Sequence, residues 1–309
     1  MITYWKQENG LKRVKTYERD AWIDITGPTA SEIELLVERF KVPEYVISDI
    51  LDPDERARTE VDGRWLIVIL RIPIYNAESE LTFYTLPLGI LISLHSIITI
   101  CSQENEAVKD IIYSTKNRSI RLDDKINFVL QLFNSSANFY LKHLKEINRL
   151  TNDIEIELEQ SAKNTDLHRL LDLEKCLVLF MTSLKSNELL LNKLQRSRLI
   201  NNEEINEDLL DDVTVEYKQA IEICKVYSDI QNGRMDTFAT VISNNLNVVM
   251  KRLTLITIIL TIPNIISGLL GMNVPNYIED NPYAFISLIG LIILLIGVSM
   301  LYFKKNKFF

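Results

Sequence analysis

Two long stretches without a charged residue lie close together in the last quarter of this 309-residue chain. The first runs from Leu253 to Leu270 and the second from Ala284 to Phe303, and both consist largely of leucine and isoleucine. A helix rises about 1.5 Å per residue, so the first stretch spans about 27 Å, close to the hydrocarbon thickness of a bilayer. Pro275 and Pro282 in the link prevent one continuous helix. The pattern predicts two transmembrane helices in a hairpin and disfavours the alternative, two buried helices of a soluble core.

Basic residues flank the two stretches on one side only. Lys251 and Arg252 precede the first, and Lys304, Lys305 and Lys307 follow the second, whereas the link contains no lysine or arginine. Positive residues are retained on the cytoplasmic side of a membrane. We therefore expect a multi-pass protein of the cell membrane with both termini in the cytoplasm and the link outside.

The amino-acid composition excludes several other classes of protein. Hydrophobic residues make up 47% of the chain, which rules out disorder. The 42 acidic residues outnumber the 34 basic ones, giving a net charge of −8 that argues against nucleic-acid binding. Cys101, Cys176 and Cys224 lie far apart and are expected to be reduced, buried thiols. The polar first ten residues predict no signal peptide.

The segment before the membrane helices divides into a mixed α/β part and a helical part. Residues 1–115 alternate strand-like and helix-like patterns between turn signals. The predicted strands are 21–25, 65–72, 81–93 and 97–101, and the predicted helices are 31–40 and 43–51.

From Gly89 to Gly268 the only glycine is Gly233, and proline is absent between Pro87 and Pro263, so long helices are expected. We predict helices over 123–163 and 166–199, and a third of about 65 residues, or about 100 Å, that begins near 205 and continues into the membrane. A helix this long needs partners to pack against. The fold class is an α+β cytoplasmic domain with a long helical stalk and two C-terminal transmembrane helices. The expected segments are 1–115 (α/β domain), 116–204 (helical hairpin), 205–252 (stalk), 253–273 (first transmembrane helix), 274–283 (outside loop), 284–303 (second transmembrane helix) and 304–309 (basic tail).

The first transmembrane stretch carries a polar stripe. Its polar or very small residues, apart from Ser267, recur at intervals of three and four, which places them on one helix face. They are Thr254, Thr257, Thr261, Asn264, Gly268 and Gly271. An asparagine facing lipid would leave its amide unsatisfied, so this face should meet protein or water. Small residues also favour close helix packing, but so long a stripe better suits a ring of helices around a pore lined by neutral oxygens.

No pattern for other chemistry competes with this interpretation. The chain has no Walker A sequence, and His95, His143 and His168 stand alone without H-E-x-x-H spacing. We therefore do not expect an enzyme.

Several motifs resemble those of the CorA-type divalent-cation (magnesium) transporters. Gly271-Met272-Asn273 closes the first transmembrane stretch, and similar segments are 243–251, 302–305, 22–27 and 48–51. The resemblance covers essentially the whole chain. It implies a funnel-shaped homopentamer in the lipid membrane, with a central pore lined by the first transmembrane helix.

The resemblance also implies roles for individual residues. Gly271, Met272 and Asn273 form the selectivity motif, with Asn273 at the outer mouth. Asp49 and Asp212 resemble the carboxylates that bind a regulatory Mg²⁺ between neighbouring funnels. The implied pore-lining residues are Asn247, Met250, Leu253, Thr257, Thr261, Asn264 and Gly268.

Three further acidic residues complete this assignment. Glu279 and Asp280 are expected to attract cations at the outer mouth, and Asp236 resembles another acidic position of the family.

The expected function is passage of hydrated Mg²⁺ into the cell down the membrane potential, gated by cytoplasmic Mg²⁺. One alternative is transport of Co²⁺, Ni²⁺ or Zn²⁺, although the stripe offers no histidine, cysteine or carboxylate for a soft metal. The other is a membrane-anchored sensor or scaffold that conducts nothing.

Overall fold

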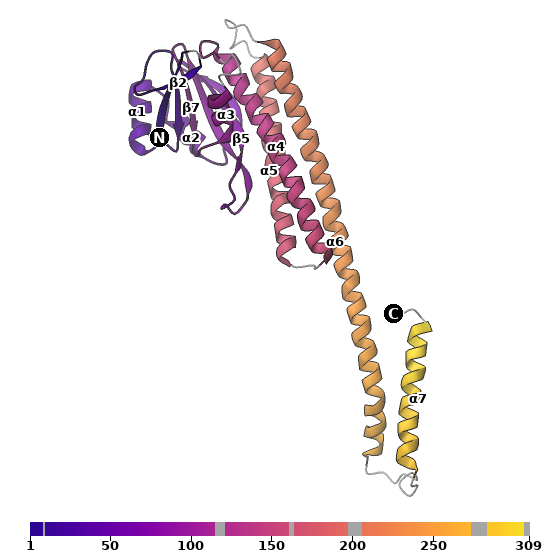
Figure 1. Ribbon diagram of the computed structural model, residues 1–309. Coiled ribbons are helices and arrows are strands. Elements are labelled where there is room, and N and C mark those ends of the chain that lie inside the picture. The colour runs from indigo at the N-terminus through magenta and orange to yellow at the C-terminus, as the bar shows by residue number, and fades with distance from the viewer. Residues whose placement is uncertain (9, 115–120, 161–163, 197–205, 273–282, 306–309) are drawn as a thin grey trace. The chain divides into compact units, whose positions relative to one another are not determined.

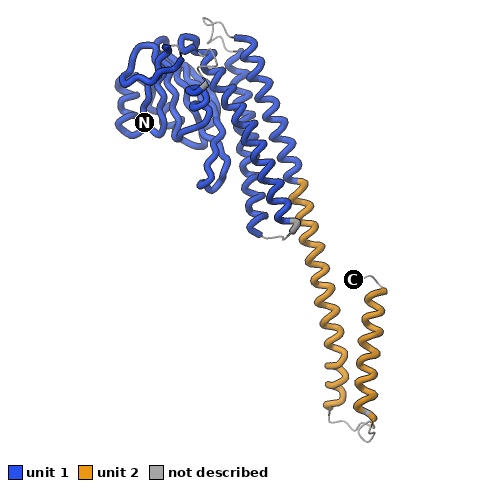
Figure 2. Tube along the Cα trace, in the orientation of Figure 1, with its two compact units in different colours: residues 1–232 blue, residues 233–309 orange. Residues whose placement is uncertain are grey.

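The computed structural model describes residues 1–8, 10–114, 121–160, 164–196, 206–272 and 283–305. The chain forms two compact units, residues 1–232 and 233–309, shown in different colours in Figure 2. The boundary falls within one long helix, α6 (Glu207–Leu270).

The first unit is built on a seven-stranded sheet in the order β2-β1-β3-β7-β6-β5-β4 (Figure 1). All neighbouring strands are antiparallel except β3 and β7, which run parallel. The central strands are nearly all apolar because both faces of the sheet are covered. The strands are β1 (Ile2–Gln7), β2 (Leu11–Val14), β3 (Trp22–Thr26), β4 (Arg58–Asp62), β5 (Trp65–Tyr75), β6 (Phe83–Ser93) and β7 (Ser96–Cys101).

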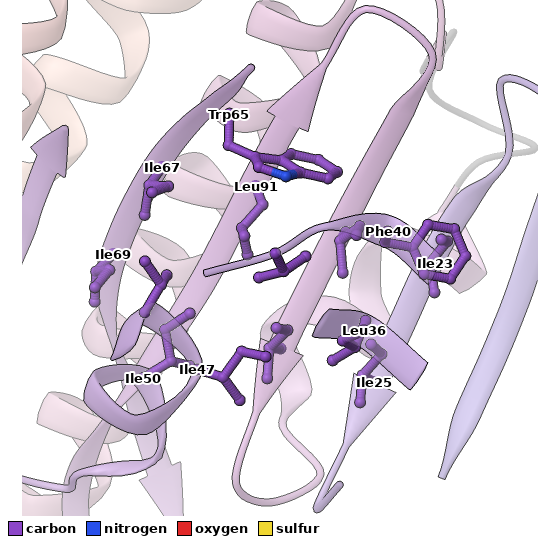
Figure 3. Packing of buried hydrophobic residues seen from close by; sticks show 14 residues of the cluster. Ile23, Ile25, Leu36, Phe40, Ile47, Ile50, Trp65, Ile67, Ile69 and Leu91 are labelled. Carbon is purple, nitrogen blue, oxygen red and sulfur yellow. The ribbon is translucent and has the colours of Figure 1, made fainter. Parts of the chain in front are cut away.

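Helices α1 (Ala30–Phe40) and α2 (Glu44–Leu51) cover one face of this sheet. Figure 3 shows Leu36 and Phe40 of α1 and Ile47 of α2 packed over the strands. Thr29 begins α1 with a reciprocal cap, in which its side chain and that of Glu32 each accept a hydrogen bond from the other residue's backbone N–H. The predicted helices 31–40 and 43–51 are confirmed.

The opposite face carries the helices α4 (Lys125–Gln160) and α5 (Asn164–Arg196), and α3 (Glu106–Ser114) packs against α4 (Figure 1). Phe128 and Tyr140 of α4, Phe180 of α5 and Tyr217 of α6 are fully buried. Their contacts are edge to face, as aromatic pairs prefer: Phe128 meets Trp22 of β3, Tyr140 meets Phe180, and Tyr217 meets Phe133 of α4. The predicted long helices 123–163 and 166–199 are confirmed over 125–160 and 166–196, and the predicted ends at 161–163 and 197–199 lie outside the described residues.

The second unit contains the last part of α6 and α7 (Ala284–Lys305). Both are long and apolar enough to cross a bilayer. In the most apolar 18-residue segment of each helix, 6% of the α6 segment and none of the α7 segment is buried within the chain. A soluble core does not account for apolar surface left open to this extent, so the two predicted transmembrane helices are supported.

Candidate functional site

The polar stripe lies on an open face of α6. Thr254, Thr257, Thr261, Asn264 and Gly268 are all exposed in the chain. The structure therefore leaves this edge free to meet other copies of the chain or water.

The opposite face of the same helix is the one that the second unit covers. Leu255 is 9% exposed, and Ile258, Ile262, Ile266 and Leu270 are half-buried. These positions also recur at intervals of three and four, about half a helical turn away from the stripe. Packing within the chain thus uses the apolar face and leaves the polar one uncovered.

Each threonine hydroxyl of the stripe donates a hydrogen bond to the backbone of its own helix. The Oγ1 atoms of Thr254, Thr257 and Thr261 donate to the carbonyl oxygens four residues earlier, at 2.8, 2.9 and 2.7 Å. A hydroxyl has one donor hydrogen and two acceptor lone pairs. The three threonines therefore present only hydrogen-bond acceptors outward, and Asn264 adds an amide whose oxygen is a further acceptor and whose NH2 group is a donor. Acceptor oxygens suit a cation or the outward-pointing hydrogens of its hydration water.

Gly268 is not required by packing inside the chain. A methyl group added there would meet no described atom within 4 Å. The small side chain therefore fits a role that involves other copies of the chain, either close approach of helices or a free path.

The stripe continues toward the N-terminal end of α6. Asn247, Met250 and Leu253 are exposed, the two apolar ones at 53% and 56%. Ser243 and Thr240 extend the same register of threes and fours and are also exposed. These two residues are not among the predicted pore-lining residues, although their spacing from Asn247 is visible in the sequence.

The outer motif is only partly described. Gly271 and Met272 are exposed just after the end of α6. Asn273, Glu279 and Asp280 lie outside the described residues.

Asp49 has a partner within its own chain. It lies in the last turn of α2, and its Oδ2 accepts a hydrogen bond from Arg58 Nη2 at 2.7 Å. The Asp49 side chain remains 37% exposed. The Arg58 guanidinium also faces Glu55 and Glu60.

Asp212 lies in the second turn of α6 with an exposed side chain, and no described residue pairs with its carboxylate. No described contact joins it to Asp49. Within the described residues, no three His, Cys, Asp or Glu side chains are grouped to hold a metal. Mg²⁺ in proteins often uses one or two carboxylates and keeps several waters, so two separate exposed carboxylates fit an ion shared between chains.

The remaining reactive groups belong to the core. Cys101, Cys176 and Cys224 are buried free thiols, and burial raises the pKa of each. His143 is buried among aromatic rings, and burial lowers its pKa. These groups stabilise the first unit and offer no second site.

Comparison with known proteins places this geometry in a family. The model of the family described as "CorA-like Mg2+ transporter protein" matches residues 18–305. The chain is 26% identical to the cobalt/magnesium transport protein CorA of Methanocaldococcus jannaschii over 92% of this chain and 90% of that protein. It is 24% identical to the protein of the same name from Thermotoga maritima over 93% of this chain and 82% of that one.

A solved structure has the same fold. The complete structure of the CorA magnesium transporter from Methanocaldococcus jannaschii superimposes with a TM-score of 0.82 at 23% identity, over 99% of this chain and 98% of that one.

Proposed function

The chain belongs to the CorA-like Mg2+ transporter protein family, and we propose that it forms a homopentameric Mg²⁺ channel in the cell membrane. In this proposal both termini are cytoplasmic, and five copies of α6 turn their polar stripes toward a central axis. The observation that carries the proposal is the exposed row of threonine and asparagine side chains on the uncovered face of α6.

The stripe is suited to an ion that keeps its water. Mg²⁺ gives up its hydration shell reluctantly. Rings made by Thr257, Thr261 and Asn264 would accept hydrogen bonds from that shell without replacing it. Neutral oxygens hold a divalent cation less tightly than carboxylates and so allow it to leave, as conduction requires.

Asn273 is proposed to form the outermost ring. Its side-chain carbonyl would receive a hydrated cation that Glu279 and Asp280 concentrate near the mouth. Entry is downhill, because a doubly charged ion gains about 4.6 kcal/mol per 100 mV of inside-negative potential.

The gate is assigned to the cytoplasmic end of the stripe. Met250 and Leu253 would form two apolar rings below the threonine rings. A narrow apolar ring excludes water and hence a hydrated ion, so small rotations of α6 would be enough to open or close the path.

Control of the gate is assigned to Asp49 and Asp212. A bound Mg²⁺ would supply positive charge between these two carboxylates of neighbouring subunits. Without it nothing bridges the two carboxylates, and the subunit contact loosens. High internal Mg²⁺ would therefore keep the funnel closed.

Conduction is tested with purified protein in liposomes that contain a Mg²⁺-sensitive dye. We expect Mg²⁺ uptake that rises with an inside-negative potential and that falls strongly in Asn273→Ala. Co²⁺, Ni²⁺ and Zn²⁺ are assayed in parallel. The absence of ion flux in well-reconstituted protein would favour a scaffold instead.

Sensing is tested in the same liposomes with Asp212→Ala. Uptake should continue when internal Mg²⁺ reaches the millimolar range, because the bridging carboxylate is gone. Glu216→Ala provides a control one helical turn away on α6. Normal inhibition in Asp212→Ala would remove this residue from the sensor.

A further inference from the structure

The Asp49 carboxylate forms an ion pair with an arginine of its own chain. Arg58 Nη2 lies 2.7 Å from Asp49 Oδ2 and 3.5 Å from Glu60 Oε1, while Nη1 is paired with Glu55. One guanidinium therefore faces three carboxylates, and one of its nitrogens is shared between two of them.

The backbone of Glu55, the residue that pairs with Arg58 Nη1, is held in place by hydrogen bonds from Arg71. Arg71, in the middle of β5, donates from Nη1 to the backbone carbonyls of Pro53 and Glu55 and from Nε to Ser183 of α5. These bonds fix the segment that precedes Arg58. Arg58 thus has a fixed anchor at Glu55 and a second nitrogen that can bond either Asp49 or Glu60.

We propose that Arg58 is an internal competitor of Mg²⁺ at Asp49 and sets the Mg²⁺ concentration at which the protein responds. The inference rests on the proposed sensing role of Asp49. Binding of Mg²⁺ requires Asp49 to exchange the guanidinium for the ion, and Arg58 then keeps Glu55 and moves toward Glu60. Because two of its three partners remain, the exchange is reversible and requires no unfolding of the loop.

The effect has a definite sign and size. A positive charge beside a half-exposed ligand repels a divalent cation, and solvent screens that repulsion to a modest level. Removal of the charge should therefore raise the affinity for Mg²⁺ by about 3- to 10-fold. A purely structural role predicts the opposite sign, because a loosened loop would weaken the site.

The test is a Mg²⁺ titration of the purified full-length protein, followed by its protection from chymotrypsin, which does not cut at arginine. Arg58→Gln should show protection at about 3- to 10-fold lower Mg²⁺ than the wild type. Arg58→Ala, a second neutral variant that adds no chymotrypsin site, should behave in the same way. Arg58→Lys keeps the charge and should stay within about twofold of the wild type.

Arg149→Gln is the matched control. Arg149 also pairs with two carboxylates, Glu146 and Asp153, but it lies on α4 and should not change the titration. An unchanged or raised midpoint in both neutral Arg58 variants would overturn the inference.

Asp49→Asn separates this inference from the proposed sensor. Loss of Mg²⁺ protection in Asp49→Asn together with an unchanged Arg58→Gln leaves the sensor standing and overturns only the competition. Full protection at the usual midpoint in Asp49→Asn overturns both.

Discussion

The side chains of single threonine residues explain how the apolar helix α6 can present a polar face. The threonine hydroxyls of the stripe donate to carbonyl oxygens of the helix backbone, and their oxygen lone pairs stay available to accept hydrogen bonds from groups outside the helix. The spacing of these residues was readable from the sequence. The orientation of their hydroxyls was not, because it depends on a local choice between the backbone and an outside partner.

Thr261→Val keeps the shape of the side chain and removes its oxygen. We expect Mg²⁺ uptake into liposomes to fall about tenfold or more, because one hydrogen bond to a hydrated ion is worth about 1 kcal/mol and the change is repeated in every subunit. Ser267→Ala removes a hydroxyl from the same helix outside the stripe and should have little effect. Equal losses in the two variants would show that the stripe has no special role.

Asp24 gives the first unit a dependence on pH. Desolvation raises the pKa of its carboxyl to about 6, even though Thr99 Oγ1 donates a hydrogen bond to it at 2.8 Å. The folded state then holds the proton more tightly than the unfolded state does. Its contribution to stability is full below pH 4 and is lost as the pH rises through 6.

Asp24→Asn removes this dependence and keeps an oxygen for Thr99. The variant should be more stable than the wild type at pH 7.5 by about 3 kcal/mol, with the difference shrinking toward pH 4. Thermal unfolding of the purified protein at several pH values measures this. A constant difference across the range would contradict it.

At the scale of elements, burial decides which parts of the fold were predictable. The central strands β5, β6 and β7 and the long helices have unbroken apolar or breaker-free sequences, and all were predicted. The strands β1, β2 and β4 were missed because they are partly exposed and mix polar with apolar residues. One signal was available: Gly63, with a φ of 56°, is the first residue of the two-residue hairpin turn Gly63-Arg64 that joins β4 to β5.

The helix that carries Asp49 depends on one glycine of the sheet. A Cβ atom at Gly89 of β6 would lie 2.1 Å from Cδ1 and 2.6 Å from Cγ1 of Ile50. Gly89→Ala should therefore push α2 outward and destabilise the protein by about 1–3 kcal/mol. Thermal unfolding of the variant measures this loss.

A second substitution tests the cause. Gly89→Ala combined with Ile50→Ala removes all three clashing carbons of Ile50, so the double variant should lose less stability than the sum of the two single variants. Additive losses would mean that the strain lies elsewhere.

At the scale of the whole molecule, the proposed pore depends on the polar stripe of α6, which can line a pore only when several copies of the chain come together. The residue-level interpretation of the stripe required a ring of copies, and the structure of one chain leaves that face open. The number of copies cannot be read from hydrophobic periodicity, because any symmetric ring would bury the same stripe. The native mass of the purified protein should be about five times the 35.8 kDa of the chain, as mass spectrometry in detergent would measure.

Cysteine accessibility tests the pore most directly. The native thiols Cys101, Cys176 and Cys224 are buried, so a single cysteine added to α6 can be followed with a small water-soluble thiol reagent. Cysteine in place of Thr257 or Thr261 should react in the membrane, and the reaction should block Mg²⁺ uptake. Cysteine at position 262 or 266, on the covered face, should stay unreactive and leave uptake unchanged. Equal reaction on both faces, or reaction on the covered face alone, would contradict a water-filled path along the stripe.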